Sequence, residues 1–287
     1  MIKIIASDMD GTLLNSNHEI SKENLEAVKK AQELGVHFTI STGRDIDGVL
    51  PVLKSYGLKC ECILSNGAEY RDEDFNILET INIEKDIVKK VIEMMNKVGI
   101  KAQLFTDRGI FTTDSQEEAL KGLAYMVQSF QKIESFEEAL EVARNQEHFN
   151  NLKYIENLEK FLETSVEIRK IFAFYNDTNV IRNMKFRLDE IEELAVSSSF
   201  RDNIEITNKM AQKGIILAKV AKKMGVKRDE VMVIGDSFND YSMFTEFTES
   251  FAMENAIDEI KKVAKYITDT NDNAGVAKAI YKALGLK

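Results

Sequence analysis

Short apolar runs alternate with amphipathic stretches along the first 80 residues of the chain. The runs 2–6, 36–40 and 62–64 are rich in β-branched and other apolar residues and have the length of buried strands. Between them, apolar residues recur at helical spacing over 21–34 and 49–56. Strands that alternate with helices are typical of right-handed βαβ units, so the pattern predicts a parallel sheet with helices on both faces.

The same pattern returns near the carboxyl end of the chain. Residues 203–207 and 231–234 are again strand-like, and 213–221 carries a helical apolar face. We therefore assign residues 1–82 and 200–287 to one doubly wound, Rossmann-like α/β core domain.

Residues 83–199, which lie between these two parts, have a different pattern of apolar and polar residues. The runs that predict helices are 87–98, 135–142 and 158–171, and those that predict strands are 102–106, 110–112, 179–181 and 193–198. No strand here ends in a corner, meaning a turn of polar residues at the end of a strand, that contains Asp-Gly or Thr-Gly. We expect an inserted α+β domain that acts as a lid.

Polar residues follow the first two strands directly. Asp8 and Asp10 come after the first, followed by Gly11, and Thr42 with Gly43 comes after the second. Side chains two apart on an extended chain project to the same side, and two like charges so close call for a cation or a shared proton. The alternative is that Asp-x-Asp-Gly is only a turn after an edge strand.

Two further polar corners lie in the second half of the chain. Asp236, Asn239 and Asp240 follow the strand 231–234, although Asp240 could serve only as a helix cap. Lys213 opens a helix, where a cation either turns to solvent or faces a bound anion. Because the carboxyl ends of parallel strands meet at one edge of a sheet, we expect all these corners to converge.

Taken together, the segments DMDGTLL, STGR, Lys213-Gly214 and GDSFND resemble the motifs of the haloacid dehalogenase (HAD) superfamily, and more narrowly its Cof-type, class IIB sugar-phosphatase branch. The resemblance covers the full length in motif order and spacing. It includes a large insertion where that branch carries its C2-type cap. It implies a HAD-like core with a C2-type cap and a phosphoric monoester hydrolase activity.

The resemblance also implies roles for the acids and the lysine. Asp8 is the nucleophile that forms an aspartyl-phosphate, Asp10 is the general acid and base, and Lys213 neutralises charge between the phosphate and Asp8. Mg²⁺ is held by the side chains of Asp8 and Asp236 and by the carbonyl of Asp10, while Asp240 supports this site from outside.

Four further residues and Thr42 are expected to contact the substrate. By resemblance Thr42, Gly43 and Asn239 hold phosphate oxygens. Arg44 and Asn66 lie just beyond the corners and could contact the leaving group or the cap. Arg44 could equally form an ion pair, and Asn66 could be only a turn residue.

Composition excludes several classes of protein. With 38 basic and 48 acidic residues the chain has a formal charge of −10, which argues against a nucleic-acid partner. It shows no apolar stretch of membrane-spanning length and no leader at Met1, so we expect a cytoplasmic protein that does not bind membranes. Its oligomeric state, monomer or homodimer, does not follow from the sequence. Cys60 and Cys62 are interpreted as small thiols rather than a metal site, and no role is assigned to the histidines.

The expected function is Mg²⁺-dependent hydrolysis of small phosphorylated metabolites, with sugar phosphates favoured. A phosphomutase or phosphotransferase would use the same residues with a different acceptor. A non-catalytic phosphate-sensing regulator is disfavoured because it has no need of both Asp8 and Asp10. The substrate itself does not follow from the sequence, and flavin mononucleotide, pyridoxal phosphate and hexose phosphates all fit.

Overall fold

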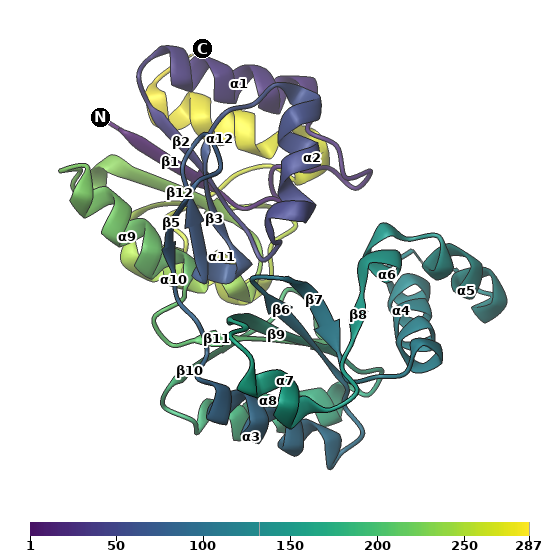
Figure 1. Ribbon diagram of the computed structural model, residues 1–287. Helices are drawn as coiled ribbons and strands as arrows, with labels where there is room; N and C mark the ends of the chain where they lie inside the picture. The colour runs from purple at the N-terminus through teal and green to yellow at the C-terminus, as the bar shows by residue number, and fades with distance from the viewer. Residues whose placement is uncertain (132, 287) are drawn as a thin grey trace. The chain divides into compact units, whose positions relative to one another are not determined.

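The computed structural model of the chain describes residues 1–131 and 133–286 (Figure 1). These residues form two compact units. The first, the core unit, joins Met1–Ile81 to Met210–Lys287, and the second, the inserted unit, is Asn82–Lys209.

The core unit is built on an eight-stranded sheet in the order β14-β13-β12-β1-β2-β3-β4-β5. Its strands are β1 Ile4–Ser7, β2 His37–Ser41, β3 Glu61–Leu64, β4 Glu69–Arg71, β5 Ile77–Thr80, β12 Val231–Gly235, β13 Glu249–Ala252 and β14 Tyr266–Ile267. The six strands from β14 to β3 are parallel, and β4 and β5 are antiparallel additions at one edge. This sheet confirms the predicted doubly wound core.

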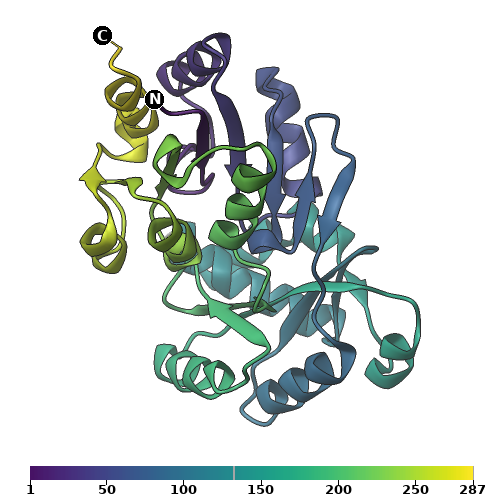
Figure 2. The same cartoon turned by 90° about the vertical axis from the view of Figure 1, so that its left-hand side faces the viewer.

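Helices cover both faces of the core sheet (Figures 1 and 2). They are α1 Lys22–Glu33, α2 Ile46–Tyr56, α9 Lys213–Lys223, α10 Tyr241–Glu246, α11 Asp258–Val263 and α12 Gly275–Leu284, with 3₁₀ turns at Ser65–Gly67, Arg228–Glu230, Phe238–Asp240 and Asn271–Asn273. α1 packs against α12, and α9 against α10. Ser21 caps α1, since its side chain accepts a hydrogen bond from the backbone N–H of Asn24.

The inserted unit has a six-stranded, mostly antiparallel sheet in the order β10-β11-β9-β6-β7-β8. Its strands are β6 Ala102–Thr106, β7 Gly109–Thr112, β8 Lys153–Tyr154, β9 Ile168–Phe174, β10 Leu194–Ser197 and β11 Asn203–Asn208. Its helices are α3 Lys85–Asn96, α4 Gln116–Gln131, α5 Phe136–Arg144, α6 Glu147–Asn151, α7 Leu158–Glu163 and α8 Thr178–Asp189. α3, α7 and α8 share one apolar core with the sheet, and α4 to α6 enclose a smaller one.

Four details of the predicted insertion are wrong. β11, assigned to the core, pairs with β9 and β10, because Ile204 and Ile206 belong to the apolar core of the inserted unit. The boundary between the units therefore falls after Lys209 and not after residue 199. Residues 179–181 lie in α8, since the Asp177 side chain caps a helix there.

The fourth error concerns residues 158–171, which were expected to form one helix. The structure ends α7 at Glu163 and begins β9 at Ile168. Apolar residues spaced at both two and three positions fit either a helix or a strand, so periodicity alone could not locate this change.

Candidate active site

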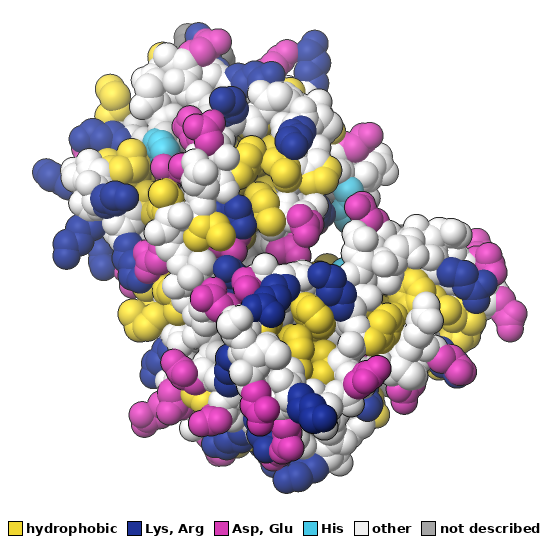
Figure 3. Space-filling view, in the orientation of Figure 1, with side chains coloured by type: hydrophobic (Ala, Val, Ile, Leu, Met, Phe, Trp, Pro, Cys, Tyr) yellow, Lys and Arg dark blue, Asp and Glu magenta, His cyan; other side chains and the backbone are white. Residues whose placement is uncertain are grey.

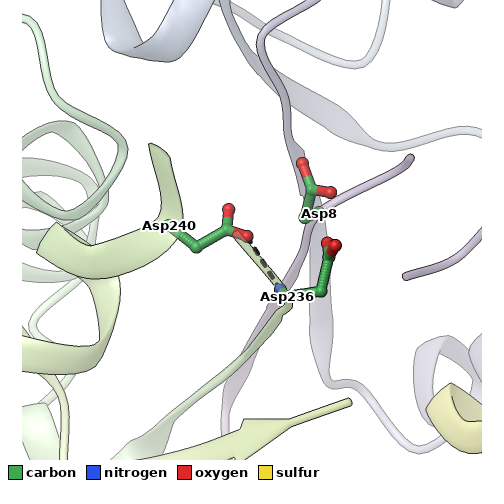
Figure 4. A group of neighbouring side chains, drawn as sticks. All are labelled: Asp8, Asp236 and Asp240. Atoms are coloured by element: carbon green, nitrogen blue, oxygen red, sulfur yellow. Dashed lines mark hydrogen bonds between the residues drawn. The ribbon is translucent and has the colours of Figure 1, made fainter. Parts of the chain in front are cut away.

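The carboxyl ends of two adjacent parallel strands bring three acids together. β1 and β12 pair in register, with Ser7 opposite Ile234, so Asp8 and Asp236 follow the ends of neighbouring strands. Asp240 closes the 3₁₀ turn that follows. One carboxylate oxygen from each aspartate lies within 4.8 Å of the others. Figure 4 shows the three side chains turned toward one another.

Lys213 is fully buried and joins two of these acids. Its Nζ donates hydrogen bonds to Asp8 Oδ1 at 2.7 Å and to Asp240 Oδ1 at 2.6 Å. Burial alone would lower the pKa of Lys213, but Asp240 and Asp8 outweigh it and raise the pKa above its usual value. The surface position considered for this lysine is therefore excluded, and the ammonium stays charged.

A close helix approach makes the lysine's placement possible. A Cβ on Gly214 would lie 2.1 Å from the carbonyl oxygen of Ser242, so only glycine lets α9 lie this close to α10. The Gly214 N–H donates to Ser242 Oγ at 2.9 Å. α9 therefore begins at a fixed distance from the strand ends.

Asp240 does more than cap a helix. Its Oδ2 accepts hydrogen bonds from the backbone N–H groups of Asp236, at 2.9 Å, and Ser237, at 3.1 Å. Its Oδ1 accepts from Lys213. Both oxygens are thus engaged within the protein, and Asp240 positions the loop that carries Asp236.

Asp236 is held by two hydroxyl groups to which the sequence motifs assign no role. Thr12 Oγ1 donates to Asp236 Oδ1 at 2.9 Å, and Ser237 Oγ donates to Oδ2 at 3.0 Å. Gly11, with φ +73°, leaves room for this carboxylate, because a Cβ there would lie 2.7 Å from Oδ2. The only sequence signal for Thr12 and Ser237 is that each is adjacent to a motif glycine or aspartate.

Negative charge exceeds positive charge in this cluster. Burial and the neighbouring Asp240 raise the pKa of Asp236 to about 7. Burial also raises the pKa of Asp8 well above its usual value, although Lys213 opposes this. The cluster contains three carboxylates and one lysine. The ligand atoms that the three aspartates could offer to a metal are all oxygens, which Mg²⁺ prefers. The residues present therefore fit a divalent cation.

Asp10 points to a different partner. Arg44 donates to it from Nε, 2.8 Å from Oδ2, and from Nη2, 2.6 Å from Oδ1. His18 Nδ1 lies 3.8 Å from Oδ1. Burial would raise the pKa of Asp10, but His18 and Arg44 hold it well below its usual range. Of the two roles considered for Arg44, the structure shows the ion pair, and it is with Asp10.

The second and third strands contribute a linked pair of corners. Thr42 is buried, and its Oγ1 accepts a hydrogen bond from Arg44 N–H at 3.2 Å. The backbone N–H of Asn66 donates to the carbonyl of Thr42 at 3.0 Å. Asn239 Nδ2 donates to Asn66 Oδ1 at 3.3 Å. Asn66 therefore connects the corner after β2, where Gly43 also lies, to the corner after β12.

The family follows from a comparison with known proteins. The chain matches the model of the haloacid dehalogenase-like hydrolases over residues 5–280 and belongs to that family. The chain is 31% identical to the 5-amino-6-(5-phospho-D-ribitylamino)uracil phosphatase YwtE of Bacillus subtilis, over 99% of this chain and 98% of that protein. It is 32% identical to YcsE, a phosphatase of the same name from that species, over 97% and 94%.

Solved structures agree with this assignment. A haloacid dehalogenase-like hydrolase from B. subtilis, 29% identical, superposes with a TM-score of 0.86 and covers 97% of this chain and 99% of its own. A HAD subclass IIB sugar phosphatase, 22% identical, shares the fold with a TM-score of 0.77 over 99% of each chain. The protein is thus an enzyme, a phosphoric monoester hydrolase of the Cof-type HAD branch. Among the described residues, no helix has the length and apolar character needed to cross a membrane.

Proposed function

We propose that this enzyme is a Mg²⁺-dependent phosphatase of small phosphorylated metabolites that works through an aspartyl-phosphate at Asp8. The observation that supports this most is the buried contact between Asp8 Oδ1 and the Lys213 ammonium. One oxygen of the nucleophile is fixed by this bond. Its other oxygen accepts no hydrogen bond from the described residues and is available for in-line attack.

The reaction then proceeds in two displacements. An oxygen of Asp8 attacks phosphorus, the ester P–O bond breaks, and the leaving oxygen takes a proton from Asp10. A water molecule next attacks the aspartyl-phosphate, Asp10 takes a proton from it, and phosphate leaves. Lys213 remains cationic throughout and offsets the negative charge that gathers at the phosphoryl group.

The ion pair with Arg44 affects the protonation state of Asp10 during this cycle. It favours the ionised carboxylate, which suits the second displacement, in which Asp10 accepts a proton. The first displacement needs the protonated carboxyl, so the contact with Arg44 has to open before it. Thr42, Gly43 and Asn239 are proposed to hold phosphate oxygens.

Mg²⁺ would be held by the side chains of Asp8 and Asp236 and by the carbonyl of Asp10. When bound, it would supply positive charge against the phosphate oxygens. Asp240 would keep the Asp236 loop in place through its two backbone hydrogen bonds.

Sugar or sugar-alcohol phosphates are the proposed substrates. The relatives YwtE and YcsE are named for a phosphorylated ribitylamino compound, whose phosphate is carried on a sugar alcohol. More distant relatives, 25% identical in Klebsiella pneumoniae and 26% identical in Serratia proteamaculans, are named HMP-PP phosphatases. A phosphate on a small polar metabolite is therefore the expected common feature.

Phosphate release from a panel of such compounds, in Mg²⁺ and in EDTA, tests the proposal. Wild-type enzyme should release phosphate only with the metal, and Asp8→Asn should reduce turnover at least about 10³-fold. Asp74→Asn, at an exposed acid of the same unit, is the matched control and should retain turnover. Turnover by Asp8→Asn at the wild-type rate would refute the mechanism, and transfer to an added sugar would indicate a phosphotransferase.

A further inference from the structure

The core unit carries a groove that includes none of the candidate active-site residues. It has a volume of about 640 Å³ and lies between one face of α9, the loop after α9 and the end of α10. Its apolar lining is Ile215, Ala218, Ala221, Val226 and Phe247. The groove is a depression open to solvent, not an enclosed cavity, so a ligand there would keep part of its surface in water.

Basic side chains surround the apolar lining. Lys219, Lys222, Lys227 and Arg228 all line the groove, against one acid, Glu246. The chain as a whole has fewer basic than acidic residues, 38 against 48. Basic side chains also gather at the left of Figure 3, where Figure 1 places α9. The local excess of positive charge thus runs against the average of the protein.

Acids form ion pairs with two of these four cations, and Glu230 accepts a hydrogen bond from the backbone N–H of a third, Lys227. Lys219 Nζ lies 2.6 Å from Glu79 Oε1, and Arg228 Nη2 lies 2.8 Å from Glu246 Oε2. For Lys222 and Lys227 the described residues provide no carboxylate within ion-pair distance.

The helix dipole explains one of the two remaining lysines. Lys222 lies in the last turn of α9, where a cation offsets the negative end of the dipole. Lys227 lies beyond the end of the helix, and its charge adds to that of Lys222 at the same groove. Two ammonium groups beside an apolar floor form a site that is complementary to an anion with an apolar body.

We propose that this groove binds a small organic dianion, of the chemical class of an aromatic or aliphatic phosphate, at a site separate from the active site. The anionic group contacts Lys222 and Lys227, and the apolar body lies on Ile215 and Val226. Because Ile215 and Lys222 belong to the helix that begins with Lys213, the ligand contacts the same helix that positions the catalytic lysine.

Phenylphosphonate is a suitable probe, because it combines an aromatic ring with a phosphonate and has no ester bond for the enzyme to hydrolyse. Binding is followed by methyl NMR, with Ile215 and Val226 as reporters in the groove and Ile40, next to the Thr42 corner, as the reporter of the active site. The variants are Lys222→Gln/Lys227→Gln and the matched control Lys29→Gln/Lys54→Gln, at exposed lysines of α1 and α2.

The groove reporters should shift in wild-type protein and in the control, with an affinity at least about tenfold weaker in Lys222→Gln/Lys227→Gln. Inorganic phosphate, which cannot use the apolar floor, should shift them more weakly. Shifts at Ile40 alone, or an unchanged affinity in Lys222→Gln/Lys227→Gln, would overturn the proposal. If the groove signals broaden as the protein concentration rises in the absence of ligand, the proposal is also overturned. A second copy of the chain would then be the occupant of the groove.

Discussion

Lys213 Nζ lies 2.7 Å from Asp8 Oδ1, although 205 positions separate the two residues in the chain. The contact depends on the pairing of β1 with β12 and on the close approach of α9 to α10. It connects the two segments of the core unit at the point where the proposed chemistry takes place.

Replacing Lys213 with methionine should therefore lower the stability of the fold. The change leaves Asp8 and Asp240 buried without their cation, which should lower the free energy of unfolding by about 3–5 kcal/mol. Urea denaturation measures this, with Lys29→Met on the exposed face of α1 as the control. An unchanged free energy of unfolding would show that the buried contact is not energetically coupled to the fold.

Arg44→Gln should change the pH dependence of activity. Arg44 keeps the pKa of Asp10 low, so its removal raises that pKa. Because the first displacement needs a protonated Asp10, the alkaline limb of the kcat/KM profile should move to higher pH. Arg187→Gln, in the inserted unit, is the control. An alkaline limb that stays in place would mean that Arg44 does not control the proton on Asp10.

A second titratable pair lies at the other end of the core strands. His37 Nε2 is 3.0 Å from Glu61 Oε2, and Tyr70 donates a hydrogen bond to the same oxygen. The Glu61 carboxylate raises the pKa of His37, although burial opposes it. A raised pKa stabilises the fold below the unfolded value of about 6.5, and this contribution is lost as the pH rises through the folded value.

His37→Gln should consequently be less stable than wild type by about 1 kcal/mol near pH 6 and by much less near pH 9. Denaturant unfolding at the two pH values measures the difference. A gap between the two proteins that is constant with pH would contradict the effect of the ion pair.

The sequence predicted those parts of the site that depend on local pattern. Asp8, Thr42 and Asp236 each follow a short β-branched strand, and parallel pairing alone brings such strand ends together. The pairing of Arg44 with Asp10 was not predicted, because it depends on how the loop after β1 lies against the loop between β2 and α2. Thr12 was missed as a partner of Asp236 for a similar reason, since the two lie 224 positions apart.

The inserted unit was harder to predict than the core. β11 has the composition of a core strand, and only its pairing with β9 and β10 shows where it belongs. A short β-branched run fits any sheet that offers an apolar face, so its partner is decided by tertiary packing rather than by its own residues.

The central claim is that Asp8 carries the phosphoryl group, and the most direct measurement traps it there. Enzyme that is turning over p-nitrophenyl phosphate in Mg²⁺ is quenched in acid and treated with borohydride, which reduces an acyl phosphate on aspartate to homoserine. Peptide mass spectrometry should find homoserine at position 8 only when substrate was present, and not in Asp8→Asn. Intact aspartate at position 8 in enzyme that is turning over, or homoserine at another position, would contradict the mechanism.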